Sequence, residues 1–176
     1  MIEQLRALQK QLQDEKRRDF KRRVSLGDLV TDRWTNADEM GFGEGTSCYD
    51  NVLIIGEVLV GRNTWIGPNA ILDGSGGLLV IGDFCSISAG VQIYTHNSVE
   101  WSTSLGEKPF AKAPTRIGNG VYIGPNCVVS MGVTIGDRAV IGAMSLVNDD
   151  IPAGAKAWGT PARVQAPSVA KPGPAG

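Results

Sequence analysis

The chain of 176 residues lacks the features that define several large classes of protein. Its formal net charge is only −1, so no overall positive field would attract nucleic acid, and we expect no such partner. A run of about 18 apolar residues, the length that spans a membrane, is missing. Charged Glu3, Arg6 and Lys10 interrupt the start, unlike the apolar core of a signal peptide. We therefore expect a cytoplasmic protein.

Cysteine and histidine are also scarce. Cys48, Cys85 and Cys127 are odd in number and show no CxxC spacing, which argues against a disulfide framework or a zinc site. We accordingly expect no metal. His96 is the only histidine, so it is either incidental or central to function.

Glycine is abundant, with 23 residues, and much of it recurs in a repeat with a period of six. From residue 117 the chain reads IGNGVY, IGPNCV, VSMGVT, IGDRAV, IGAMSL and VNDDIP. Upstream, VGRNTW and IGPNAI follow the same frame until DGSGG, residues 73–77, shifts it. The fifth position of the hexads is small or β-branched, and it holds Thr64, Ala70, Cys85, Val91, Val121, Cys127, Val133, Ala139 and Ser145.

This period predicts a short strand and a corner in each hexad rather than a helix, whose apolar residues would recur every three or four positions. Strand alternation turns the first aliphatic residue and its small partner inward. Glycine or another small residue at position two is expected to form the corner. Stacked coils then share one core, in which Cys85 and Cys127 serve as small buried residues rather than reactive thiols.

Hexads of the form [Ile/Val/Leu]-Gly-x-x-[small]-x resemble those of the hexapeptide-repeat acyltransferases over about residues 50–164. The resemblance implies an all-β solenoid, a left-handed parallel β-helix, although the general crossover rule would favour the right hand. About four coils are expected, with an N-terminal α-helix and one long loop extruded from the coils. A homotrimer with active sites between subunits is implied as well.

The pattern divides the chain into four parts: an N-terminal helix at 1–26, an irregular cap segment at 27–50, the β-helix domain at 51–164 with a loop at 94–116, and a disordered tail at 165–176. An apolar stripe at Ile2, Leu5, Leu8 and Leu12 predicts the helix.

Two features of these flanks invite an interpretation. The basic stretch KRRDFKRR, residues 16–23, is either a solvated or packed helix face or a contact with an anionic membrane surface. Trp34 and Phe42 are expected to cover the open first coil, because an uncapped coil exposes strand edges and core.

The longest break in the repeat, YTHNSVEWSTSLGEKPFAKAPTR, begins two residues before His96. Loops extruded from a rigid solenoid commonly carry function. In family members that modify hydroxyls, a histidine just before such a loop is the general base, and His96 with Asn97 matches that position. The chemistry suits the residue type, because a neutral imidazole accepts a proton near neutral pH.

The same loop supplies the expected acceptor site, with Asn97, Glu100 and Trp101 as substrate-binding residues. Glu100 is a candidate either for orienting His96 or for contacting substrate. Trp101 and Phe110 either stack on a sugar ring or fix the loop in place.

The resemblance also implies a site for acetyl-CoA as co-substrate. IGAMSLV, residues 141–147, is similar to the family's Gly-Ala-x-Ser stretch, so Gly142 and Ala143 are expected to contact the pantetheine arm through their backbones. WGTPAR, residues 158–163, is similar to the closing Gly-x-Pro-Ala-[Arg/Lys] motif. It adds Gly159, Thr160 and Arg163, with Arg163 and Lys156 as phosphate partners or merely solvated charges.

The favoured function is an acetyl-CoA-dependent O-acetyltransferase that acts on a sugar hydroxyl in surface polysaccharide biosynthesis. CSISAGVQIYTH, the long loop and APTRIG resemble such enzymes. An N-acyltransferase for a nucleotide-linked amino sugar is the alternative, although some of these work without a histidine. A non-catalytic scaffold is more remote, and a γ-type carbonic anhydrase would need three histidines on zinc.

Overall fold

The computed structural model describes residues 1–165, and the tail expected to be disordered lies outside them from residue 166 on. The helices are α1 (Ile2–Phe20), α2 (Leu26–Val30), α3 (Arg33–Glu39) and α4 (Val99–Thr103). The strands are β1 (Ser47–Cys48), β2 (Leu53–Val60), β3 (Trp65–Ile66), β4 (Ile71–Ile81), β5 (Ser86–Ile87), β6 (Gln92–Ile93), β7 (His96–Asn97), β8 (Ala111–Lys112), β9 (Thr115–Ile117), β10 (Tyr122–Ile123), β11 (Val128–Val129), β12 (Thr134–Ile135), β13 (Val140–Ile141), β14 (Leu146–Val147), β15 (Lys156–Gly159) and β16 (Ala162–Val164).

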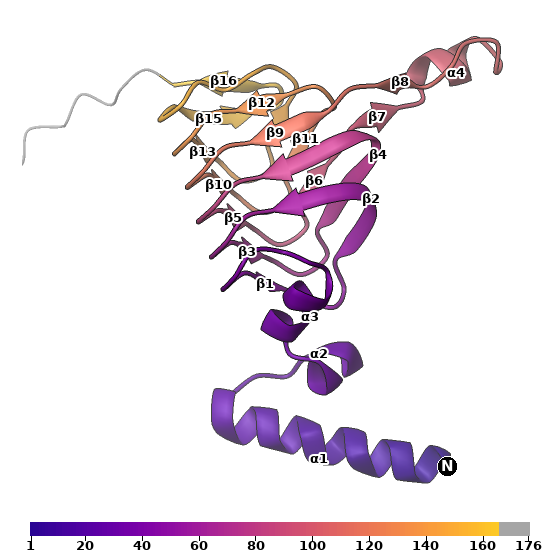
Figure 1. Cartoon of the computed structure of the whole chain (residues 1–176), viewed down its shortest axis with the longest axis vertical. Helices are drawn as coiled ribbons and strands as arrows, with labels where there is room; N and C mark the ends of the chain where they lie inside the picture. Colours follow the sequence, from indigo (N-terminus) through magenta and orange to yellow (C-terminus); the bar gives the residue numbers. More distant parts are fainter. Residues whose placement is uncertain (166–176) are drawn as a thin grey trace, which may run out of the picture.

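The strands stack in parallel along three faces of a β-helix (Figure 1). The first face runs β1-β3-β5-β10-β13-β15, with β16 added antiparallel at its end. In the second face, the start of β2 and of β4 lies beside β6, β11 and β14. The third face carries the ends of β2 and β4, then β9 and β12. β2 and β4 are long because each passes around a corner and serves two faces.

The core consists of aliphatic ladders that the strand register stacks directly above one another. On the first face the ladder joins Cys48, Ile66, Ile87, Ile123, Ile141 and Ala157, all buried. All nine side chains at the fifth hexad position are buried as well. The prediction that both positions face inward is confirmed, and Cys85 and Cys127 are two of these core residues.

The corners differ from the expectation that small residues at position two would form them. The left-handed backbone conformation instead falls at position four, as at Asn63 (φ 53°) and Asn126 (φ 57°), a conformation that asparagine tolerates better than most residues. Glycine at position two has another cause, namely close approach of the next coil. A Cβ on Gly124 would lie 2.6 Å from the backbone nitrogen of Ala143.

The β-helix has more coils than the expected four or so, as shown by the six parallel strands that follow one another on the first face. The extra coils come from segments without the glycine signature, including β1, which lies inside the supposed irregular cap. That cap also contains α2 and α3, and Asp32 begins α3 by accepting hydrogen bonds from the Trp34 and Thr35 nitrogens. Phe42 is buried against the first coil as expected, whereas Trp34 is 52% exposed.

The N-terminal helix α1 lies across the end of the β-helix, away from the hairpin that contains α4 (Figure 1). None of its residues is buried, so its apolar stripe faces outward. Within residues 1–165, no helix is both long enough and apolar enough to cross a membrane.

Candidate active site

His96 lies at the root of a hairpin that leaves the β-helix after β6. Its strand β7 pairs antiparallel with β8, which places His96 opposite Lys112. The preceding residue, Thr95, is fully buried and fixes this root to the coil above. Its hydroxyl donates to the Asp73 carbonyl oxygen at 2.8 Å and accepts from the Gly76 nitrogen at 2.9 Å. A rigid coil therefore positions the histidine.

A buried carboxylate, that of Asp73, orients the imidazole. His96 Nδ1 lies 2.9 Å from Asp73 Oδ2, and Asp73 is 1% exposed. The other carboxylate oxygen accepts from the Ser75 nitrogen at 2.8 Å, while Ser75 Oγ lies 3.2 Å from His96 Nδ1. Sequence reasoning missed Asp73 and considered Glu100 instead. The available signal was the frame shift at DGSGG, because Asp73 is the first residue of that insertion.

The insertion reaches His96 because glycine allows its backbone to pass unusually close. A Cβ on Gly76 would lie 2.6 Å from the His96 Cβ, closer than side chains tolerate. The insertion therefore packs directly against the histidine, so the insertion and the loop form one structure. The two breaks in the hexad frame, far apart in sequence, meet at a single corner of the β-helix.

This geometry suits general base chemistry. A carboxylate at Nδ1 favours the tautomer with the proton on that nitrogen, so the lone pair is on Nε2. The His96 side chain is 30% exposed, and an acceptor can therefore reach the ring. Asp73 also stabilises the imidazolium that forms when Nε2 takes a proton.

The loop provides an aromatic wall beside the base. The rings of His96 and Phe110 are nearly parallel, with centroids 6.1 Å apart, and Trp101 meets Phe110 edge-on at 5.5 Å. Trp101 and Phe110 are 45% and 42% exposed, so both fix the loop and still present surface to a ligand. Glu100 does not orient His96, since its carboxylate is paired with Lys108.

Asn97, the other predicted acceptor residue, has a structural task. Its Oδ1 accepts from the Val99 nitrogen at 3.0 Å, and its Nδ2 lies 3.4 Å from the Met131 sulfur. These contacts begin α4 and hold the loop near the coil of Met131. Asn97 is only partly buried, so part of its side chain is accessible to a ligand.

The predicted donor residues form a second cluster near the end of the β-helix. Ser145 connects them, because its hydroxyl donates to the Gly142 carbonyl oxygen at 2.7 Å and accepts from the Gly159 nitrogen at 3.1 Å. Thr160 Oγ1 donates to the Met144 carbonyl oxygen at 3.4 Å. Gly142 needs to be glycine for a reason internal to the fold, since a Cβ there would lie 2.8 Å from Trp158 Cβ.

The predicted phosphate partners are exposed. Lys156 points into solvent at the start of β15, and Arg163 Nη1 lies 3.3 Å from Asp149 Oδ2 in a pair that is more than half exposed on both sides. Exposed pairs of this kind contribute little stability, so Arg163 can readily exchange Asp149 for another anion.

One chain does not bring the base and the donor cluster together. His96 follows β6, whereas Gly142 and Ala143 form the corner before β14, and β11 lies between those two strands in the second face. Two levels of a β-sheet correspond to about 10 Å, and the two groups also lie at different corners.

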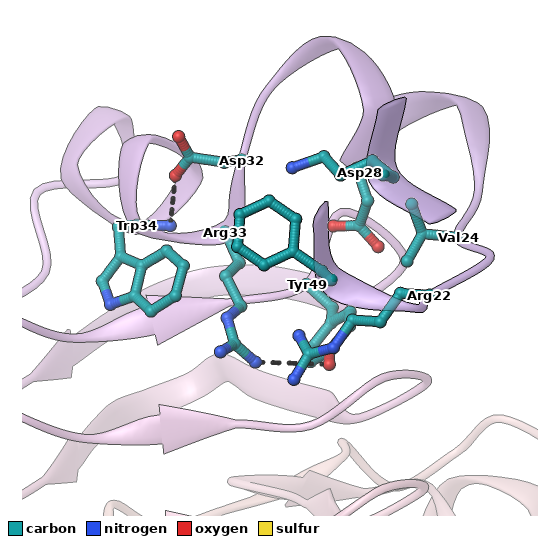
Figure 2. Close-up of a pocket in the computed structure, with 9 residues that line it drawn as sticks. Arg22, Val24, Asp28, Asp32, Arg33, Trp34 and Tyr49 are labelled. Carbon is teal, nitrogen blue, oxygen red and sulfur yellow. Dashed lines mark hydrogen bonds between the residues drawn. The ribbon is translucent and has the colours of Figure 1, made fainter. Parts of the chain in front are cut away.

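A separate pocket of about 180 Å³ lies at the other end of the molecule, between the N-terminal helices and the first coil (Figure 2). It contains none of the residues predicted from the sequence to act in catalysis. Among residues 1–165 there is also no group of three histidine, cysteine, aspartate or glutamate side chains arranged to hold a metal ion.

Comparison with known proteins supports the hexapeptide resemblance. The family model described as bacterial transferase hexapeptide (six repeats) matches residues 114–149. Galactoside O-acetyltransferase of Escherichia coli K12 is 55% identical over 51 residues, which are 29% of this chain and 25% of the relative. Chloramphenicol acetyltransferase of Morganella morganii is 36% identical over 103 residues, 48% of this chain and 49% of the relative. The matches thus span half or less of these relatives.

Solved structures match more of the chain. A galactoside acetyltransferase in complex with coenzyme A has a TM-score of 0.67 and 29% identity, covering 92% of this chain and 77% of that one. A hexapeptide-repeat acetyltransferase from Vibrio cholerae complexed with acetyl coenzyme A has a TM-score of 0.66 and 25% identity, covering 92% and 87%. The predicted left-handed β-helix of the hexapeptide acetyltransferases is confirmed.

Proposed function

We propose that this hexapeptide-repeat β-helix is an acetyl-CoA-dependent O-acetyltransferase that acts on a sugar hydroxyl, of the kind found in surface polysaccharides. The observation that carries the proposal is the pair of His96 and buried Asp73, with Nδ1 and Oδ2 2.9 Å apart. A histidine that only fills space has no need of a buried carboxylate. A general base gains from one, because the carboxylate orients the ring and stabilises its charged form.

In the proposed reaction, Nε2 of His96 takes the proton of the acceptor hydroxyl as its oxygen attacks the acetyl carbonyl carbon of the thioester. The carbon–sulfur bond then breaks, and the imidazolium returns the proton to the leaving CoA thiolate. Asp73 is a positioning residue that stabilises the charged ring between these two proton transfers. No net proton is gained or lost by the enzyme.

The aromatic wall suits a sugar as acceptor. Sugar rings present apolar C–H faces, and the exposed rings of Trp101 and Phe110 offer matching flat surfaces beside His96. Asn97 and Glu100, at the start of the same loop, supply polar groups for sugar hydroxyls. Glu100 would exchange its partner Lys108 for substrate.

The donor is proposed to bind at the cluster of Gly142, Ala143, Gly159 and Thr160, with Lys156 and Arg163 at its phosphates. Since one chain keeps that cluster apart from His96, the complete site requires a neighbouring subunit. A homotrimer is therefore part of the proposal. The outer surface supports subunit contact, because β2 exposes apolar Leu53 and Ile55 on the second face and Leu59 on the third.

The decisive experiment is to measure release of free CoA from acetyl-CoA with matched pairs of acceptors, each pair consisting of a sugar and its amino-sugar analogue. An O-acetyltransferase gives faster release with the hydroxyl member and a product that alkali hydrolyses as an ester. Transfer only to the amino member would reject the O-acetyl assignment in favour of amide formation.

The subunit requirement has its own test. Light scattering is expected to give three times the mass of one chain. Mixing inactive His96→Ala protein with inactive protein altered at exposed Ala143 is expected to restore part of the activity, because mixed trimers contain some interfaces with both intact residues. An active monomer, or no recovery after subunit exchange has been verified, would contradict a shared site.

A further inference from the structure

The pocket at the N-terminal end has an unusual lining for a structural gap. Its walls come from the end of α1, the link to α2, the start of α3 and the residue after β1 (Figure 2). Aromatic and cationic side chains make up most of the lining. The lining residues are Lys16, Phe20, Arg22, Val24, Asp28, Asp32, Arg33, Trp34 and Tyr49.

Arg33 is one of the cations that line this pocket, and only part of its guanidinium is hydrogen-bonded. Its guanidinium carbon lies 4.3 Å from the Trp34 ring centroid and 5.6 Å from that of Tyr49. Nη1 donates to the Tyr49 hydroxyl at 3.3 Å. Nε is buried and has no hydrogen-bond partner within residues 1–165. An unpaired buried donor on a charged group is costly, so an acceptor placed here would be stabilising.

Within residues 1–165, the other two cations, Lys16 and Arg22, form no ion pair, and the Lys16 ammonium lies 5.3 Å from the Phe20 ring centroid. The ion pairs formed by residues 1–165 are Lys10–Asp14, Arg18–Asp19, Arg62–Asp83, His96–Asp73, Lys108–Glu100 and Arg163–Asp149. Three cations and two carboxylates line this one small pocket, so a bound anion would balance the remaining positive charge.

The two carboxylates in the lining are already engaged in the fold. Asp32 accepts from the Trp34 and Thr35 nitrogens as the cap of α3. Asp28 is buried, and its Oδ1 accepts from the Asp50 nitrogen at 3.2 Å. Burial raises the pKa of the Asp28 carboxyl. Three cations against two carboxylates leave the lining with a small positive balance.

We infer that this pocket binds a phosphate monoester whose organic part is a ring or a short apolar group. A phosphate monoester carries nearly two negative charges and three acceptor oxygens, which matches a lining with three cations better than a single carboxylate would. Phe20, Trp34 and Tyr49 provide flat apolar walls for the attached group. The volume, about 180 Å³, suits a ligand the size of one ring.

Phenyl phosphate is the probe for this inference, with calorimetric titration at constant ionic strength as the measurement. We expect saturable binding at one site per chain, several-fold tighter than inorganic phosphate because the ring packs against the aromatic walls. Phenol at the same concentrations is expected not to saturate, because it lacks the charge that the three cations recognise.

Charge variants locate the site. Arg22→Gln and Lys16→Gln are each expected to weaken phenyl phosphate binding by about ten-fold, the loss of one charge-assisted hydrogen bond. Arg18→Gln is the matched control, because Arg18 lies on α1 like Lys16 but pairs with Asp19 and does not line the pocket. Arg33→Met is expected to have the largest effect, and if its fold fails, the two more exposed variants still decide the question.

Two results would overturn the inference: no saturable binding to the wild type, or equal weakening by Arg18→Gln and Arg22→Gln.

The source of the phosphate is decided by comparing binding to vesicles of phosphatidic acid with binding to vesicles of phosphatidylcholine. If the ligand is a lipid headgroup, the protein should bind phosphatidic acid vesicles. Phenyl phosphate should displace the protein from them, and Arg22→Gln should abolish the binding. If the ligand is instead a free phosphate ester, Arg22→Gln should weaken vesicle binding no more than Arg18→Gln does. Acetyl transfer should be unaffected by all these variants, since α1 lies far from the hairpin (Figure 1).

Discussion

The regular coils and the corner at His96 are built from the same chain but differ in what their residues contact. In the regular coils, each inward aliphatic residue stacks on its equivalent in the next coil, as Ile87, Ile123 and Ile141 do. At the interrupted corner, Asp73, Thr95 and His96 have individual polar partners instead. A repeat tolerates exchange among similar residues, whereas the corner depends on particular atoms. We therefore expect substitutions in the coils to lower stability and substitutions at the corner to lower turnover.

Removing the base is expected to have the largest effect on the reaction. His96→Ala should lower turnover by roughly 10²–10⁴-fold, the contribution of a general base. The melting temperature should fall only modestly, because buried Asp73 loses its imidazole partner but keeps the hydrogen bond from the Ser75 nitrogen. Steady-state kinetics and calorimetry on the same preparation measure both quantities. A variant that retains near wild-type turnover on its true acceptor would place the base elsewhere.

In the coils, a substitution is expected to lower stability and to leave turnover nearly unchanged. Ile123→Ala should reduce the free energy of unfolding by about 2–5 kcal/mol, because it leaves a cavity in a fully buried ladder. Turnover per folded molecule should remain close to that of the wild type. Tyr122→Ala is the control, since that neighbouring side chain points outward and is 42% exposed. Equal losses of stability in the two variants would refute the inward ladder.

Asp73→Asn tests the orienting carboxylate without removing bulk. An amide at this position donates a hydrogen bond to Nδ1 and so favours the tautomer that lacks a lone pair on Nε2. Turnover with a hydroxyl acceptor is expected to fall by about a hundred-fold, and turnover with an amine acceptor by less. An unchanged ratio between the two acceptors would mean that Asp73 serves only the fold.

Ser75→Ala should have a small effect on turnover, within a few-fold. Its hydroxyl lies 3.2 Å from His96 Nδ1, but Asp73 is closer, carries the charge and keeps its bond from the Ser75 backbone nitrogen. Kinetics measured beside Asp73→Asn give the comparison directly. If Ser75→Ala were the more damaging of the two variants, the assignment of Asp73 as the orienting group would be wrong.

The cysteines are expected to show the smallest response of all. Burial raises the pKa of the Cys48 thiol to about 12 and also raises the pKa of Cys85 and Cys127. A higher pKa means less thiolate at pH 8, so iodoacetamide should label the native protein very slowly. Mass spectrometry should find all three labelled in denaturant. Fast labelling of one native cysteine would show that its coil opens.

The fold was predictable from the sequence to the extent that it repeats. Position one and position five of each hexad identified the core, because stacking imposes the same burial on every coil. The coil number was underestimated, since β1 and the long strands β2 and β4 lack the glycine signature and are recognised only by their pairing. The corner was predicted at position two, whereas the residues with left-handed backbone conformation, such as Asn126, lie at position four.

The sequence by itself determined the solenoid, its inward residues and the isolation of one histidine at a break in the repeat, because these follow from local periodicity. Only the tertiary structure decided the partner of that histidine. Asp73 is 23 positions earlier in the chain, and a coil of the β-helix returns the backbone to the same corner, where Gly76 allows close approach. Contacts between successive coils depend on the exact path around each corner, including inserted residues, and a six-residue pattern does not encode that path.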